Sequence, residues 1–236
     1  MEKILRGREI RPARGKLGVL IPGIGAVTTT LLAGVFAARK GAARPLGSVT
    51  QMGKIRLGKR TEKRTVLVKE LVPLADLHDL EFGGWDIFPD TAYESAQNAE
   101  VLNTLHIESV KEELERVVPM TAVFDKNYVK KLDGQHVKKG KNKMDLAEQL
   151  MKDIETFKTT RQVDRLVVCW AASTEAYHQT SKVHSSLREF EEGLKNNSEA
   201  VTPSQVYAYA ALKMKVPYIN GAPHLTTDCP ALLVLA

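Results

Sequence analysis

Two short, mostly apolar runs stand out in the chain. The first is Lys16–Ile21 (KLGVLI), which ends in Pro-Gly, and the second is Leu166–Trp170 (LVVCW), which ends in small residues. Continuous apolar runs of this length are typical of strands that are buried on both faces of a parallel sheet. We therefore predict a central strand at each run. A third, shorter strand is predicted at Pro217–Asn220 and a fourth, which alternates apolar and polar residues, at Thr65–Glu70.

Helical patterns lie between these strands. A helix is predicted from Gly25 to Gly41, with Arg39 and Lys40 in its last turn, where cations favour the helix dipole. Capping-box patterns and apolar stripes predict the other helices. These begin at Thr91, Ser109 and Thr202, cover Asp145–Phe157, and carry Leu187, Phe190 and Leu194 in register. Residues 82–90 are predicted to form a turn-rich loop, and residues 44–64 a long loop or extension.

Strands that alternate with helices predict an α/β fold with a mostly parallel sheet. The composition agrees, because 236 residues with 43% hydrophobic and 26% charged side chains form an ordinary globular mixture. We divide the chain into a basic N-terminal arm, residues 1–15, and one domain, residues 16–236. The most apolar stretch, Leu17–Ala38, is interrupted by Pro22, glycines and threonines, so no membrane span is predicted.

Charge and cysteine content narrow the function classes. A formal net charge of +6 suits anionic ligands such as phosphates and does not by itself imply nucleic acid. Cys169 and Cys229 lack CxxC spacing, and the six histidines lack paired metal-ligand spacing. This pattern argues against a disulfide framework and a zinc site, and it fits a reducing cytoplasm.

One glycine loop follows the first predicted strand and opens the first predicted helix. In Gly23-Ile24-Gly25-Ala26-Val27, one glycine permits the tight turn, and the next lets the backbone approach a pyrophosphate at the helix N-terminus. Thr28 replaces the usual third glycine, and no acid occurs about twenty residues on, where a ribose hydroxyl is usually bound. The loop is therefore open to two interpretations, dinucleotide binding or a turn needed only for packing.

Three further loops pose the same choice. In Phe82–Asp86 (FGGWD), Asp86 is either a ribose ligand or a residue that satisfies its own turn. Ala171–Glu175 (AASTE) follows the second strand, where ligands collect in parallel sheets, yet its hydroxyls also suit a helix cap. Asn220–Pro223 follows the last strand and poses the same question.

Two basic clusters support a different hypothesis, a nucleic-acid-binding protein. Lys54–Arg64 holds six cations in eleven residues, and Lys126–Lys143 holds seven in eighteen. Neither cluster interleaves aromatic residues that could stack on bases. Solvated basic loops explain the clusters better.

Taken together, these stretches resemble the inositol-phosphate synthases, in particular their compact bacterial branch. The matching runs keep the family's order from about residue 16 onward, and FGGWDIF together with YINGAP is highly specific. The runs are LIPGIGAVTTTLLAG, GSVTQMGKIRLGKRT, PLADLHDLEFGGWDIFPDTAYESA, KGKNKMDLAEQLM, VVCWAASTE and VYAYAALKMKVPYINGAPHLTTDCPAL.

The resemblance implies a Rossmann-like domain with helices on both faces of the sheet, in a cytoplasmic NAD-dependent isomerase. This enzyme would convert D-glucose 6-phosphate to an inositol monophosphate by oxidation, enolisation, aldol cyclisation and reduction. The resemblance also implies the NAD contacts. Gly23, Ile24, Gly25, Ala26 and Val27 would hold the pyrophosphate, Asp86 the adenosine ribose, Ala122 and Val123 the adenine, and Ala172, Ser173, Thr174, Gly221 and Ala222 the nicotinamide side.

The resemblance also implies what this stretch of sequence leaves out. The family's catalytic lysines, its DFKSGQT-type segment and the sheet that forms its homotetramer follow the position equivalent to Leu232–Ala236. No catalytic residue is therefore assigned, and these 236 residues alone are expected to be inactive or nearly so. The alternative is a non-catalytic NAD-binding fragment or relic of such an enzyme. No metal, nucleic-acid or membrane partner is predicted.

Overall fold

The computed structural model describes residues 14–236, and its centre is a five-stranded sheet in the order β5-β4-β1-β6-β7. All the pairings in this sheet are parallel. The strands are β1 Leu17–Pro22, β4 Leu80–Asp86, β5 Met120–Thr121, β6 Arg165–Trp170 and β7 Tyr218–Asn220. The predicted α/β, Rossmann-like fold is confirmed. Residues 1–13, most of the predicted basic arm, lie outside the described residues.

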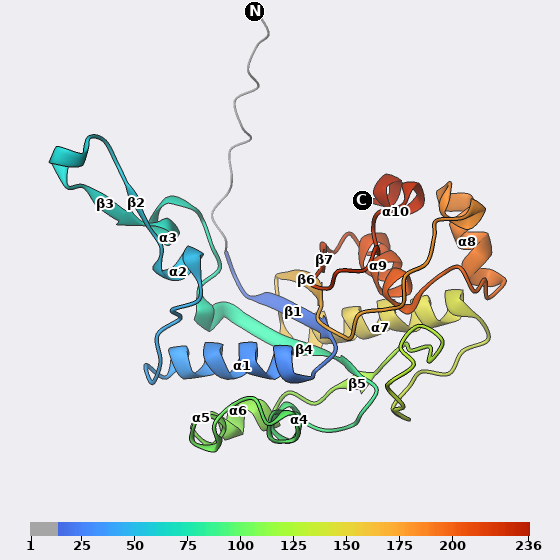
Figure 1. Ribbon diagram of the computed structural model, residues 1–236, viewed down its shortest axis with the longest axis horizontal. Coiled ribbons are helices and arrows are strands. Elements are labelled where there is room, and N and C mark those ends of the chain that lie inside the picture. Colours follow the sequence, from blue (N-terminus) through green and yellow to red (C-terminus); the bar gives the residue numbers. More distant parts are fainter. Residues whose placement is uncertain (1–13) are drawn as a thin grey trace, which may run out of the picture.

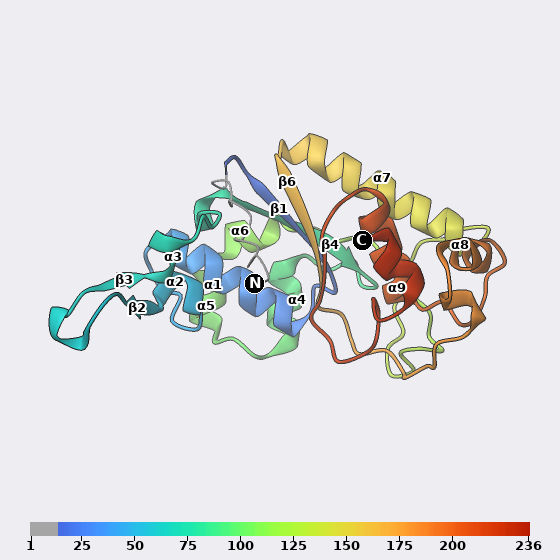
Figure 2. The same cartoon turned by 90° about the horizontal axis from the view of Figure 1, so that it is seen from above.

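Helices cover both faces of the sheet, with α1, α4 and α6 on one side and α7 and α9 on the other (Figure 2). Each side has its own apolar core, and β4 contributes to both, since Phe82 joins the first and Trp85 the second. The helices are α1 Ala26–Arg39, α2 Val49–Met52, α3 Val68–Leu71, α4 Ala92–Ala99, α5 Thr104–Glu108, α6 Lys111–Glu115, α7 Lys143–Arg161, α8 Leu187–Lys195, α9 Pro203–Lys213 and α10 Pro230–Leu235. Short 3-10 helices lie at Arg60–Glu62, Leu77–Asp79 and Lys182–His184.

The turn-rich loop predicted at residues 82–90 is wrong for its first half, which belongs to the buried strand β4. Its two glycines serve packing rather than a turn. A Cβ atom on Gly83 would lie 2.5 Å from the Phe157 ring, and one on Gly84 would lie 2.0 Å from the carbonyl oxygen of Ile21 in β1. Side chains at these positions are excluded by their neighbours, so a glycine pair that looks like a turn forms part of the sheet.

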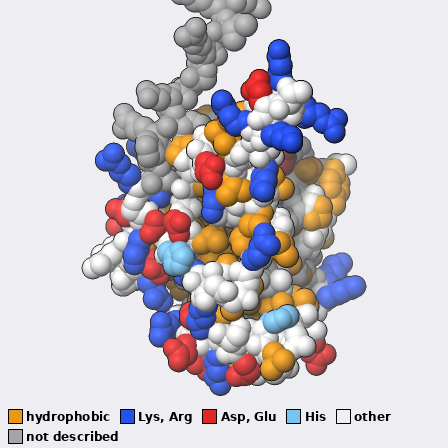
Figure 3. Space-filling view, turned by 90° about the vertical axis from the view of Figure 1, so that its left-hand side faces the viewer, with side chains coloured by type: hydrophobic (Ala, Val, Ile, Leu, Met, Phe, Trp, Pro, Cys, Tyr) orange, Lys and Arg blue, Asp and Glu red, His pale blue; other side chains and the backbone are white. Residues whose placement is uncertain are grey.

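The segment from α2 to α3, residues 49–71, lies between α1 and β4 and forms a projecting arm, distinct from the N-terminal arm (Figure 1). It holds α2, α3 and an antiparallel hairpin of β2 (Lys54–Arg56) and β3 (Thr65–Leu67). Lys and Arg side chains gather on the face where the arm lies (Figure 3). The prediction of a plain loop at residues 44–64 was therefore incomplete, and the strand predicted at Thr65–Glu70 ends at Leu67, where α3 follows.

Two of the three predicted capping boxes are confirmed, at Thr91 of α4 and at Thr202 of α9. The box predicted at Ser109 is wrong, because Ser109 closes the unpredicted helix α5 and its hydroxyl donates to the carbonyl of His106. Helix α7 includes the predicted Asp145–Phe157 and extends beyond it at both ends. Helix α1 ends just before Gly41, which has a φ of +70°.

Candidate functional site

A cavity of about 760 Å³ lies at the carboxyl ends of the five parallel strands. In such sheets ligands bind where the strand order reverses, which here is between β1 and β6. The volume lies within the range of small-molecule sites. Every residue assigned from the sequence lines this cavity, namely Gly23, Ile24, Gly25, Ala26, Val27, Asp86, Ala122, Val123, Ala172, Ser173, Thr174, Gly221 and Ala222.

The loop after β1 brings the start of α1 to the middle of this cavity. Gly23 has a φ of +92°, and a Cβ atom there would lie 2.4 Å from Cα of Ala172, so the loops after β1 and β6 touch at this glycine. Gly25 is the N-cap of α1, and the first turn carries no acidic side chain. The first N–H groups of a helix have no intrahelical partner and favour an anion. This turn can therefore hold a phosphate.

Asp86 ends β4, the strand beside β1, and its carboxylate is held by the backbone. Oδ2 accepts a hydrogen bond from N–H of Ile24 at 2.6 Å, and Oδ1 accepts one from Phe88 at 3.0 Å. Burial raises the pKa of Asp86, while these N–H donors lower it. Each oxygen keeps a second lone pair, so the side chain can still accept from a ligand hydroxyl.

The sheet brings Asp86 next to the glycine loop although the two are far apart in sequence. No acid occurs about twenty residues after the glycine loop, because the projecting arm is inserted between α1 and β4. Asp86 instead lies at the carboxyl end of β4, the strand next to β1.

The other half of the cavity is formed by the segments after β5, β6 and β7. Two backbone bonds extend the sheet into these loops, from Ala171 to the carbonyl of Pro22 and from Gly221 to that of Trp170. On the β5 side, Val123 N–H donates to the Tyr207 hydroxyl at 2.8 Å. Ala122 and Val123 are both buried, so they expose only a small area to the cavity.

The cavity carries acidic side chains and lacks basic ones within the described part of the chain. Asp86, Asp90 and Glu175 line it, and no Lys, Arg or His of residues 14–236 does. An anion would therefore depend on backbone N–H groups and the α1 terminus. Negative charge that developed on a bound ligand would therefore meet no cationic side chain among these lining residues, although cationic groups are one of the means by which such charge is stabilised.

Comparison with known proteins identifies the family. A family model named for NAD binding and described as myo-inositol-1-phosphate synthase matches residues 17–236. The chain belongs to the myo-inositol-1-phosphate synthase family. It is 49% identical to inositol-3-phosphate synthase 1 of Bacteroides thetaiotaomicron, covering 95% of this chain and 52% of that protein. It is 35% identical to a probable inositol 3-phosphate synthase isozyme of Arabidopsis thaliana, covering 94% and 46%.

Solved structures show the same likeness. Inositol-3-phosphate synthase of Caenorhabditis elegans superposes with a TM-score of 0.87 at 29% identity, covering 96% of this chain and 47% of that one. A myo-inositol-1-phosphate synthase-related protein of Thermotoga maritima, at 20% identity and a TM-score of 0.64, shows the fold alone. The chain spans about half the length of the relatives it matches.

Among the cavity-lining residues that were not assigned from the sequence, Tyr207 and Glu175 hold other parts of the site in place. Tyr207 packs edge-on against Trp85 and Trp170, and its hydroxyl accepts a hydrogen bond from the backbone N–H of Val123. Glu175 lay inside a segment considered for binding, yet it was given no role. Burial raises the pKa of Glu175, opposed by hydrogen bonds from Ser204. The position of Glu175 directly after Ser173 and Thr174 was the signal in the sequence that could have indicated a role for it.

Within residues 14–236, no helix combines the length and apolar character needed to cross a membrane. In the same residues, no group of three or more His, Cys, Asp or Glu side chains could hold a metal ion.

Proposed function

We propose that this chain is the NAD-binding part of an inositol-phosphate synthase. One observation carries the proposal: the acid-free N-terminal turn of α1 and the carboxylate of Asp86 lie side by side in one cavity, joined by the Ile24–Asp86 hydrogen bond of 2.6 Å. A phosphate-binding helix terminus beside a ribose-binding acid is the arrangement that a dinucleotide requires. Family membership supports the same cofactor.

The site residues take roles that follow their positions around the sheet. The Gly23–Val27 loop holds the pyrophosphate, and Asp86 accepts from the adenosine ribose. Ala122 and Val123 border the adenine. Ala172, Ser173, Thr174, Gly221 and Ala222 line the nicotinamide side, where small side chains leave room for the ring and a substrate.

The whole enzyme would produce an inositol monophosphate, the product that the names of the relatives give. The family resemblance supports D-glucose 6-phosphate as its substrate. Held by the Gly23–Val27 loop and Asp86, NAD would supply reversible hydride transfer, so the net reaction would be an isomerisation. The residues of this chain would bind and orient the cofactor and leave the proton and alkoxide chemistry to cationic groups elsewhere. A cytoplasmic location fits the free Cys169 and Cys229.

A second candidate is an NAD-binding module without catalysis. It is favoured by the absence of Lys, Arg and His among the cavity-lining residues of the described chain. Both candidates require NAD to bind in this cavity, and the experiments below test that shared requirement.

Asp86→Ala is expected to weaken NAD binding about tenfold or more, because a hydrogen bond to a charged group contributes roughly 1.5–3 kcal/mol. The substitution also removes support for the Ile24 and Phe88 amides, so affinity for NAD alone cannot separate the two effects. Binding of AMP and of 2′,3′-dideoxy-AMP, measured by calorimetry on both chains, separates them. The wild-type chain should prefer AMP, and the variant should lose that preference.

Asp79→Ala is the matched control, since it removes the same charge from an exposed residue at the opposite end of β4. It should leave both affinities unchanged. If Asp86→Ala weakened both nucleotides equally, Asp86 would support the loop without contacting the ribose, and the assignment would fail.

A further inference from the structure

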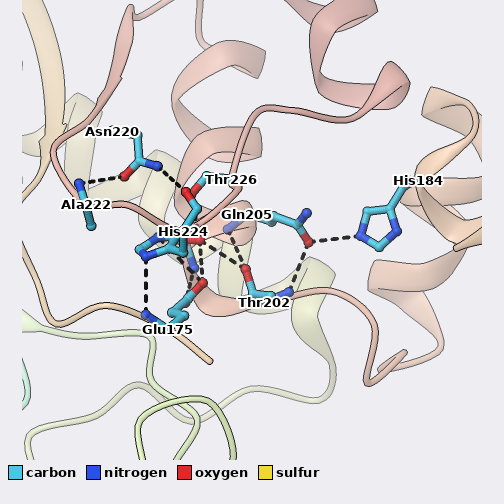
Figure 4. A network of polar contacts seen from close by, with 9 residues as sticks. Glu175, His184, Thr202, Gln205, Asn220, Ala222, His224 and Thr226 are labelled. Atoms are coloured by element: carbon cyan, nitrogen blue, oxygen red, sulfur yellow. Dashed lines mark hydrogen bonds and ion pairs between the residues drawn. The ribbon is translucent and has the colours of Figure 1, made fainter. Parts of the chain in front are cut away.

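A buried polar cluster joins the loops after β6 and β7 to the start of α9 (Figure 4). Its centre is Glu175, whose side chain is 1% exposed although no Lys or Arg pairs with it in the described chain. Burying a carboxylate without a full counter-ion is costly, so its hydrogen bonds must compensate. Glu175 bonds to two segments that are distant from it in sequence, through its carboxylate to one and through its backbone N–H to the other.

The first segment is the start of α9. Ser204 donates twice to the carboxylate, through its N–H to Oε1 at 2.7 Å and through its hydroxyl to Oε2 at 2.6 Å. Ser204 lies in the first turn of this helix, where free N–H groups and the dipole favour an anion. Glu175 therefore occupies the helix terminus as an internal anion, which fixes the loop after β6 to α9.

The second segment is the loop after β7. N–H of Glu175 donates to Nδ1 of His224 at 3.2 Å. The carbonyl of His224 accepts from the Asn220 amide at 2.7 Å, and Oδ1 of Asn220 accepts from N–H of Ala222 at 3.1 Å. The Thr226 hydroxyl donates to Ser204 at 3.0 Å and closes the cluster. The loop that carries Gly221 and Ala222 is thus joined to the loop that carries Ser173 and Thr174.

The hydrogen bond to His224 also determines which nitrogen of its imidazole ring carries the proton. Because Nδ1 accepts from a backbone N–H, neutral His224 carries its proton on Nε2, which lies 3.8 Å from Oε2 of Glu175. Nε2 is buried and has no hydrogen-bond partner in the described chain. The imidazole also packs edge-on against Trp170, which ends β6.

We propose that Glu175 is a positioning residue for the nicotinamide side of the cavity: its buried carboxylate and N–H hold the loops after β6 and β7 at the spacing that the ring requires. The proposal rests on the proposed NAD site. It assigns the two parts of NAD to different parts of the site. The Gly23–Val27 loop and Asp86 bind the ADP-ribose part, and the Glu175 cluster shapes the pocket for the nicotinamide ring.

The test compares NAD with ADP-ribose, which lacks only the nicotinamide ring. By calorimetry on the 236-residue chain, Glu175→Ala is expected to lower affinity for NAD by about tenfold. Affinity for ADP-ribose should change less than about twofold. Glu175→Gln keeps the shape and an acceptor for Ser204, so it should restore most of the NAD affinity. A merely structural role would weaken both ligands together.

Ser204→Ala provides a milder variant in case Glu175→Ala does not fold, because it removes one of the two bonds to the carboxylate and leaves the N–H. It should shift the ratio of the two affinities in the same direction. Glu192→Gln, at an exposed residue of α8, is the control and should shift neither.

The possible results are distinguishable. Equal weakening of both ligands by Glu175→Ala or Ser204→Ala, or no weakening by either variant, would overturn this proposal and leave the NAD site intact. Failure of the wild-type chain to bind either ligand would overturn the proposed function and this proposal with it.

Discussion

Gly84→Ala is expected to prevent stable folding, or to lower the free energy of unfolding by about 3 kcal/mol or more. The added methyl group would meet the carbonyl oxygen of Ile21 at 2.0 Å, and Ile21 is the register partner of Gly84 in the parallel pair of β1 and β4. Backbone atoms in the middle of a sheet cannot turn aside as a flexible side chain can. The variant must therefore separate the two strands that carry the glycine loop and Asp86. Urea unfolding followed by circular dichroism measures the effect.

Gly34→Ala makes the same chemical change at a place with open space. Gly34 is an exposed interior residue of α1, and a Cβ atom there meets nothing within 4 Å. The variant should raise the free energy of unfolding by about 0.5–1 kcal/mol, since glycine is unfavourable inside a helix. If Gly84→Ala were as stable as Gly34→Ala, the close approach of β1 and β4 described here would be wrong.

Gly25→Ala is expected to weaken NAD binding by about a hundredfold or more while leaving stability nearly unchanged. Gly25 has a φ of −94°, which alanine adopts freely, and a Cβ atom there meets no protein atom within 4 Å. The space it would fill is the space a pyrophosphate needs in order to reach the N–H groups at the start of α1. Losing two charge-assisted hydrogen bonds of roughly 1.5–3 kcal/mol each gives the stated factor.

Calorimetric titration with NAD, together with urea unfolding, tests this separation of binding from stability. Gly34→Ala again serves as the control, because it lies farther along the same helix and should bind NAD as the wild-type chain does. NAD affinity that Gly25→Ala leaves intact would show that the pyrophosphate does not approach this turn.

The sequence allowed the strands β1, β6 and β7 and the helices α1, α4, α7, α8 and α9 to be predicted because their signals are local. The apolar runs at β1 and β6 and the capping boxes at Thr91 and Thr202 depend on neighbouring residues alone. Strand β4 was missed because its glycines are explained by atoms of β1 and α7, which lie far away in sequence.

The site residues could be selected by resemblance to the family, but the hydrogen bonds that join them could not be predicted. Nothing in the sequence indicates that Asp86 accepts from Ile24, that the Tyr207 hydroxyl supports Val123, or that Glu175 joins two loops through Ser204 and His224. Each of these contacts joins residues at least 29 positions apart, and the shortest separation is that between Glu175 and Ser204. Such pairs become visible only when the sheet order is known.

The central claim is that this chain binds NAD at the carboxyl ends of its strands, and amide NMR during an NAD titration tests it most directly. At about 1 mM NAD, we expect the largest amide shifts at Ile24–Thr28, with further shifts at Ser173, Thr174, Gly221 and Ala222. The amide signals of the projecting arm should not shift. No shifts at that concentration, or shifts confined to the basic residues Lys54–Arg64 of the arm, would contradict it.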